Sequence, residues 1–181
     1  LYNGKSGIIF DPERKAMGFR SALTAKLVEP DLRKELSRSQ RVFMPEQAKY
    51  AYCATRDALR NAGIDQDYLN SHEVGLLYGN DSSTVPVVNA VDTMREKKDT
   101  TLCGSGAIFQ SMNLGCSFKL KGINLTVSGA CASGSHAIGL GALLIQNGLQ
   151  DMVVCGGAQE VNPWSVGSFD GISAFSTRER E

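Results

Sequence analysis

The sequence predicts an α/β protein with parallel strands, and the segment from residue 124 to residue 157 is the basis of that prediction. Residues 124–128 are β-branched and apolar, as is typical of a strand. Residues 136–146 are apolar on nearly every side, which predicts a helix buried all round. Residues 151–155 form a second apolar run before Gly156-Gly157. A strand–helix–strand unit of about thirty residues is a βαβ crossover, and its two strands run parallel.

The elements before this unit follow in chain order. Residues 1–11 indicate a turn that leads into a short extended segment, and residues 12–41 show no regular pattern. Pro45 suits the first turn of a helix, and residues 46–62 carry apolar side chains at helical spacing. Gly63 is a suitable stop for that helix.

Two further segments complete the pattern. Residues 73–78 predict a short apolar strand that ends at Gly79, and residues 91–101 are charged and expected to be exposed. The 181 residues contain no internal repeat, low-complexity stretch or linker. We therefore expect a single α/β domain.

The composition excludes several classes of function. Apolar residues make up 42% and charged residues 21%, as in soluble globular proteins. Nineteen basic and nineteen acidic residues cancel, so no overall field would hold nucleic acid or an anionic membrane. The longest apolar stretches, such as Ile138 to Ile145, are too short to cross a bilayer, and no secretory signal is visible.

The cysteines indicate a reducing compartment. They are five in number, scattered, and never spaced as Cys-x-x-Cys. This pattern argues against a disulfide framework and against a structural zinc site. We expect a cytoplasmic protein without a metal site.

Cys131 is the strongest candidate for chemistry. It lies where the strand at residues 124–128 turns into the following helix, whose N-terminal N–H groups and dipole favour a thiolate. Its neighbours are all small, which would let a substrate carbonyl approach the sulfur and leave the Cys131 N–H free as an oxyanion donor. The residues alone leave open the alternative that Cys131 is an inert, buried cysteine.

The segment from Val127 to Gly134, Val-Ser-Gly-Ala-Cys-Ala-Ser-Gly, resembles the active-site segment of β-ketoacyl-[acyl carrier protein] synthases of the elongating type I/II kind. The resemblance extends in order along nearly the whole chain. It includes Gly4 to Ile8, Arg41 to Met44, residues 73–80, residues 151–160, Phe169-Asp170-Gly171 and Ala174 to Thr177.

The resemblance implies a thiolase-like fold, with layers α-β-α-β-α in the full enzyme, working as a homodimer without a cofactor. It implies that Cys131 takes an acyl chain from acyl carrier protein and condenses it with malonyl-carrier. Phe169 would line the acyl pocket, although an aromatic here could equally be a plain core residue, and Val88 would limit chain length. A basic cluster would dock the acidic carrier, although such a cluster could equally be a solvated face. This basic cluster consists of Arg33, Lys34, Arg38 and Arg41.

Two histidines from the second half of the fold would complete the family's site, and this chain offers only His72 and His136. His72 is expected on the polar surface. At about 100° per residue, a helix would turn His136 roughly 140° from Cys131, so we expect it in the core without a catalytic role. The chain is therefore expected to be a β-ketoacyl synthase N-terminal domain over residues 1–181, truncated at both ends and inactive alone.

Two alternatives stay open. Gly129-x-Cys131-x-Ser133 partly matches the nucleophile elbow of α/β-hydrolases, but Ser133 replaces the last glycine and no histidine follows in the expected order. A non-catalytic synthase-like partner or chain-length subunit is the second alternative, although such subunits typically replace the cysteine. Fatty-acid and polyketide enzymes cannot be separated by these residues.

Overall fold

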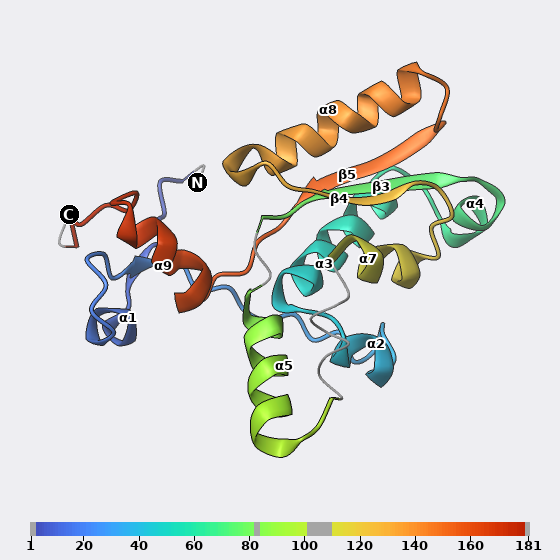
Figure 1. Ribbon diagram of the computed structural model, residues 1–181. Helices are drawn as coiled ribbons and strands as arrows, with labels where there is room; N and C mark the ends of the chain where they lie inside the picture. Colours follow the sequence, from blue (N-terminus) through green and yellow to red (C-terminus); the bar gives the residue numbers. More distant parts are fainter. Residues whose placement is uncertain (1–2, 82–83, 101–109, 180–181) are drawn as a thin grey trace. The chain divides into compact units, whose positions relative to one another are not determined.

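The computed structural model describes residues 3–81, 84–100 and 110–179 (Figure 1). These residues form two compact units, each described here by itself. The large unit is Pro30–Glu160, and the small unit combines Leu1–Glu29 with Val161–Glu181. Within the described residues, no helix is both long and apolar enough to cross a membrane.

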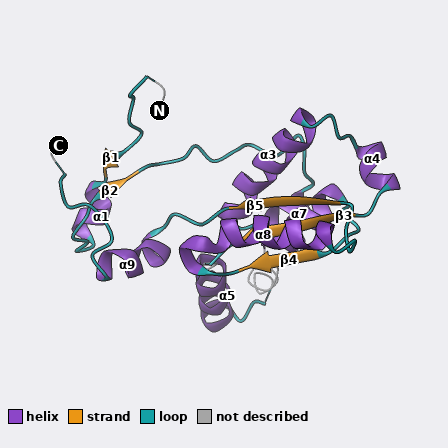
Figure 2. Cartoon of the chain, turned by 90° about the horizontal axis from the view of Figure 1, so that it is seen from above, coloured by secondary structure: helices purple, strands orange, loops and turns teal. Residues whose placement is uncertain are grey.

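A three-stranded parallel sheet forms the centre of the large unit. Its strands are β3 (Val74–Gly79), β4 (Asn124–Val127) and β5 (Met152–Gly157), in the order β4-β3-β5. The helix α8 (Ser133–Gln146) connects β4 to β5 and passes over β3 (Figure 2). The predicted α/β fold class, the parallel crossover and the three strands are thereby confirmed.

Helices cover both faces of this sheet. The helices α3 (Glu46–Asn61) and α7 (Gln110–Phe118) lie on one face, and α8 lies on the other (Figure 1). The core between the sheet, α3 and α7 includes Leu76, Tyr78 and Leu114, and the rings of Tyr52 and Phe118 stack with centroids 4.8 Å apart. The helix predicted over residues 46–62 is confirmed, and Gly63 ends it at φ +69°.

The expectation that the helix after Cys131 is buried all round is wrong for this chain. On α8, Ala137 and Gly141 are buried against the strands, whereas Ile138 is 61% exposed and Leu143 and Ile145 are also exposed. Leu125 on β4 is exposed as well, because β4 is an edge strand of the sheet in the described residues. The apolar residues of α8 therefore form an uncovered outer face.

The described residues of the large unit form four further elements. They are α2 (Arg38–Val42), α4 (Gln66–Ser71), α5 (Thr84–Lys97) and the 3₁₀ turn η1 (Ala130–Ala132). The charged segment was predicted over residues 91–101, of which Thr101 lies outside the described residues. Most of residues 91–100 lie on α5 or just after it and are exposed, as expected.

The small unit contains β1 (Ile9–Phe10), α1 (Pro12–Ala16), β2 (Leu23–Thr24) and α9 (Pro163–Gly171). Residues 12–41 were expected to be irregular, and this was wrong for α1, β2 and α2. The two helices are too short to show periodicity, but both begin with a side-chain cap. Asp11 accepts from the N–H groups of Glu13 and Arg14, and Ser37 forms a capping box with Gln40.

Arg20 and Asp170 tie the two chain segments of the small unit together. The Asp170 carboxylate accepts the backbone N–H groups of Arg20 at 2.9 Å and Ser21 at 3.0 Å. In return, the Arg20 guanidinium donates to the carbonyls of Asp170 and Gly171 at the end of α9 and to Ser173 Oγ. Carbonyls at a helix C-terminus lack intrahelical partners, so this cation satisfies them.

We expect Asp170→Asn to destabilise the protein in a pH-dependent way. The backbone N–H of Arg20, followed by that of Ser21 and the Arg20 charge, lowers the pKa of Asp170. A carboxylate with a lowered folded-state pKa stabilises the fold above its unfolded pKa of about 3.9, and that contribution is lost as pH falls through the folded pKa. In thermal unfolding of the full-length protein, the variant should melt at a lower temperature than the wild type at pH 6. This difference in melting temperature should shrink below about pH 4.

The exposed Asp67 on α4 provides a matched control, since Asp67→Asn removes a carboxylate from the large unit. That variant should melt close to the wild type at both pH values. If Asp170→Asn lowered the melting temperature equally at pH 6 and pH 3, the assigned role of the carboxylate charge would be contradicted.

Candidate active site around Cys131

Cys131 lies at the carboxyl end of the parallel sheet. The strand β4 ends at Val127, η1 covers Ala130–Ala132, and α8 begins at Ser133, so the cysteine directly precedes the helix. The thiol is free and exposed. Figure 1 shows that the three parallel strands point toward the N-terminal end of α8. The predicted place of Cys131 between a strand and a helix is therefore observed, and the inert alternative of a buried cysteine does not describe it.

The turn before Cys131 is held in a strained conformation. Ala130 has φ +49°, in the left-handed region, where a residue other than glycine costs about 1–2 kcal/mol. Ser133 is 6% exposed, and its Oγ accepts from the Gly129 N–H at 2.9 Å and donates to the Ala130 carbonyl at 2.6 Å. The backbone N–H of Ser133 donates to the same carbonyl. These bonds close the turn on both sides of Ala130.

Gly79 explains how α8 begins so close to the sheet. A Cβ at Gly79, the last residue of β3, would lie 2.5 Å from the backbone nitrogen of Gly134 and 2.5 Å from the carbonyl carbon of Ser133. Contacts of that length do not occur, and the obstacle is backbone that cannot rotate away. Only glycine therefore lets the first turn of α8, and with it the turn that carries Cys131, rest on the end of β3.

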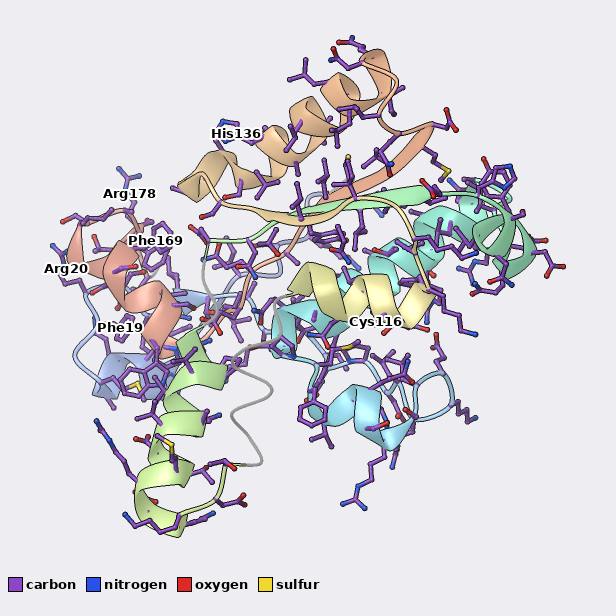
Figure 3. The ribbon with its side chains drawn as sticks, turned by 45° about the vertical axis from the view of Figure 1, so that its right-hand side comes forward. Phe19, Arg20, Cys116, His136, Phe169 and Arg178 are labelled. Carbon is purple, nitrogen blue, oxygen red and sulfur yellow. The ribbon has the colours of Figure 1, made fainter. Side chains whose placement is uncertain are left out.

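His136 is not in the core, and that expectation was wrong. The residue is exposed, and Figure 3 shows its side chain on the outer side of α8, away from the sheet. Its ring occupies the space that a Cβ on Gly129 would fill. The core placement failed because the outer side of α8, which was expected to be covered, is exposed.

The backbone N–H of Cys131 is available as a hydrogen-bond donor within the described residues. Among the hydrogen bonds of the described residues, none uses the N–H of Cys131, whereas Ala132 donates to Gly129 and Ser133 donates to Ala130. The first turn of α8 also has no side-chain cap. The N–H of Cys131 is thus in the state that the oxyanion prediction requires, although its role stays a prediction.

His72 and a pocket beside α4 lie away from Cys131. His72 is exposed at the end of α4, where its ring stacks on Tyr68 at 3.9 Å, as expected for a surface histidine. A pocket of about 430 Å³ is lined mainly by α3, α4 and the turn between them, including Leu59, Ile64 and Leu69. Since α4 precedes β3 and Cys131 follows β4, this pocket lies at the opposite end of the sheet from the cysteine (Figure 1).

Comparison with known proteins places this geometry in a family. Residues 5–181 match the family described as "Beta-ketoacyl synthase, N-terminal domain". The chain belongs to the β-ketoacyl synthase family. The resemblance inferred from the residues around Cys131 is thereby confirmed.

Relatives and solved structures agree. The chain is 33% identical over 188 residues to 3-oxoacyl-[acyl-carrier-protein] synthase 1 of Haemophilus influenzae, covering 100% of this chain and 46% of that protein. A β-ketoacyl synthase from Burkholderia phymatum has a similar structure, with a TM-score of 0.83 and 29% identity over 98% of this chain and 45% of that one. A type II polyketide ketosynthase in complex with its acyl carrier protein shares the fold, with a TM-score of 0.64 and 20% identity over 83% of this chain and 45% of that one.

The other residues implied by the β-ketoacyl synthase resemblance are separated between the two units. Phe169 lies on α9 in the small unit, half-buried, with its ring 6.0 Å from that of Phe175. Val88 lies on α5 in the large unit and is half-buried. Their roles at the acyl pocket therefore stay predictions.

The basic cluster is less uniform than its sequence indicates. Arg33 forms a bidentate ion pair with Asp31, which lowers the pKa of that carboxyl to about 2. Arg41 is half-buried, with its Nε buried and without a hydrogen-bond partner in the described residues. Within the basic cluster, Lys34 and Arg38 are the exposed side chains that form no ion pair with a described residue. A docking surface would therefore depend mainly on these two.

We expect Cys131 to be the thiol that iodoacetamide modifies first in the full-length protein. It is exposed and sits at the positive end of α8, which favours a negative charge. Burial raises the pKa of the half-buried Cys53 and Cys155, and Cys116 is exposed but lies in the last turn of α7, the negative end of that helix. Peptide mapping after limiting alkylation measures the order.

Cys116 is the internal control for that experiment, since it matches Cys131 in exposure and differs in its place on the helix. Cys103, the fifth cysteine, lies outside the described residues. Faster labelling of Cys116, Cys53 or Cys155 than of Cys131 would count against a reactive thiol at the strand–helix junction.

Proposed function

We propose that the protein is a β-ketoacyl-[acyl carrier protein] synthase that uses Cys131 as its acyl-accepting nucleophile. The observation that supports this most is the exposed, free thiol on a strained turn before α8, in a chain that matches the family over residues 5–181. The chain spans about half the length of the curated relatives it matches, 46% for the first of them. Substrates, partners and turnover of the whole protein are part of this proposal.

The chemistry proceeds as two acyl transfers. The Cys131 thiolate attacks the thioester carbonyl of acyl-carrier, and the tetrahedral oxyanion collapses to expel the carrier thiolate, which takes a proton from water and leaves an acyl thioester on Cys131. The Cys131 N–H is placed to donate to that oxyanion. Loss of CO₂ from malonyl-carrier then yields a carbanion, which attacks the acyl-Cys131 carbonyl and returns the thiolate. We assign neither His72 nor His136 to the decarboxylation, since one lies at the far end of the sheet and the other on the outer side of α8.

Assembly and location are further parts of the proposal. The edge position of β4 and the exposed Leu125 support a homodimer contact along this strand. The uncovered face of α8, with Ile138, Leu143 and Ile145, supports a further layer of the protein packing there in the thiolase-like arrangement. The spacing of the cysteines supports a cytoplasmic location.

Cys131→Ala should remove at least about a thousandfold of condensing activity in the full-length protein, because alanine offers no nucleophile. Alanine fits a site whose neighbours are all small, so the melting temperature should stay close to that of the wild type. Product formation from acyl-carrier and malonyl-carrier, with intact-mass detection of the acyl-enzyme, measures both steps.

Cys116→Ala is the matched control and should retain activity, since that thiol lies on α7. An acyl adduct on Cys131→Ala would show that another residue accepts the chain. A wild type that forms neither acyl-enzyme nor product would instead support the non-catalytic partner.

Lys34 and Arg38 should set the affinity for the carrier, which a solved relative of 20% identity binds in its own complex. Exposed charges at an interface act mainly on the association rate. Reversing both to Glu should raise the KM for acyl-carrier about two- to fivefold with little change in kcat, and the effect should shrink in high salt.

Arg60→Glu reverses an exposed charge at the C-terminal end of α3 and is the control for a charge reversal outside the basic cluster. Its KM should match that of the wild type. Unchanged kinetics in the Lys34 and Arg38 double variant would mean that these two side chains form an ordinary solvated surface.

A further inference from the structure

We propose that Ser133 is a positioning residue, whose hydroxyl fixes the orientation of Cys131 for attack on the acyl thioester. The inference rests on the proposed function, since it names a residue that serves the same nucleophile. Ser133 is the first residue of α8 and stands two positions after the cysteine. Among the described residues its hydroxyl bonds to Gly129 and Ala130 and not to the thiol, so it acts through the backbone of the turn.

The hydroxyl of Ser133 both accepts and donates a hydrogen bond within the turn. It accepts the Gly129 N–H at 2.9 Å and donates its proton to the Ala130 carbonyl at 2.6 Å. With 6% of the residue exposed, water has little access to replace these bonds. A hydroxyl that accepts and donates at these distances fixes both of the backbone groups that it contacts.

These two groups are the ones that define the strained residue. The Gly129 N–H precedes Ala130, and the Ala130 carbonyl follows its Cα, so the Ser133 hydroxyl spans the left-handed residue at φ +49°. A backbone in a sparsely populated region persists only where its surroundings hold it. Since Cys131 is bonded directly to Ala130, relaxation at Ala130 would change the direction in which the Cys131 side chain points.

The side chains on either side of the cysteine cannot do this. Ala130 and Ala132 carry only methyl groups, and α8 has no side-chain cap from Ala132. The Cys131 N–H makes no hydrogen bond within the described residues, so the cysteine's own backbone donor does not anchor it. The orientation of the nucleophile therefore depends on Ser133 more than on any neighbour in the turn.

The test compares variants of the full-length protein in a single turnover with acyl-carrier, following the acyl adduct on Cys131 by mass. In Ser133→Ala the maximal acylation rate should fall roughly tenfold, since a lost hydrogen bond of ordinary strength corresponds to about that factor. The carrier concentration at half-saturation should stay unchanged. Alkylation of Cys131 by iodoacetamide should slow much less, because a small reagent does not need a fixed direction of the thiol.

Thr and Val at position 133 form a matched pair, since they have nearly the same shape and differ in the hydroxyl. Ser133→Thr should acylate within about threefold of the wild type, and Ser133→Val should be slow, like Ser133→Ala. This pair carries the test even if the alanine variant fails to fold. Ser71→Ala is a control, because the Ser71 hydroxyl also bonds helix carbonyls but lies on α4, at the other end of the sheet.

The outcomes separate the inference from the proposed function. If the wild type acylates Cys131 and Ser133→Ala or Ser133→Val does so at the same rate, the role of Ser133 is overturned and the proposed function stands. Thr and Val variants that are equally slow overturn it as well, since the hydroxyl would not be the cause. A wild type that forms no adduct on Cys131 overturns the proposed function itself.

Discussion

The close contact between the first turn of α8 and the end of β3 is the constraint on which the candidate site depends. With no Cβ at Gly79, the backbone of Ser133 and Gly134 can lie where a side chain would otherwise be. The helix then begins directly over the carboxyl ends of the strands, so its unpaired N–H groups and its dipole point at the same end of the sheet. Cys131 is placed there by backbone packing, before any side chain takes part.

The small residues around the cysteine follow from that contact. A turn that must pass from β4 into a helix resting on β3 has little room, and Ala130 meets the demand by adopting φ +49°. The cost of about 1–2 kcal/mol is small beside the stability of a domain, but it needs local support, which the Ser133 hydroxyl supplies. The strain at Ala130 is thus a consequence of the position of Cys131. The hydrogen bonds of Ser133 hold the turn in this one conformation.

The sequence predicted the parts of the fold that local pattern determines. The strands β3, β4 and β5, the helix α3 and the junction at Cys131 all have periodicity or composition of their own. Gly79 was not recognised as functional, because its importance arises from a contact between β3 and α8, which are more than fifty residues apart. Ser133 was not recognised because its hydroxyl bonds to Gly129 and Ala130 depend on the conformation of the turn, which composition does not reveal. His136 was wrongly placed in the core because the apolar composition of α8 predicted a helix covered on every side, and its outer side is exposed. The caps at Asp11 and Ser37 were the signals that could have revealed α1 and α2.

The burial of α8 shows where sequence and structure contain different information. Its apolar composition predicts a helix that is buried on every side. In the part of the chain that the structure describes, only the side with Ala137 and Gly141 is buried. Ile138, Leu143 and Ile145 would not be selected for contact with water, so their exposure supports a covering layer in the proposed whole enzyme. Such a layer would also exclude water from the start of the helix. In a drier site the Cys131 N–H and the helix dipole would act on a developing oxyanion more strongly than they can on the exposed thiol.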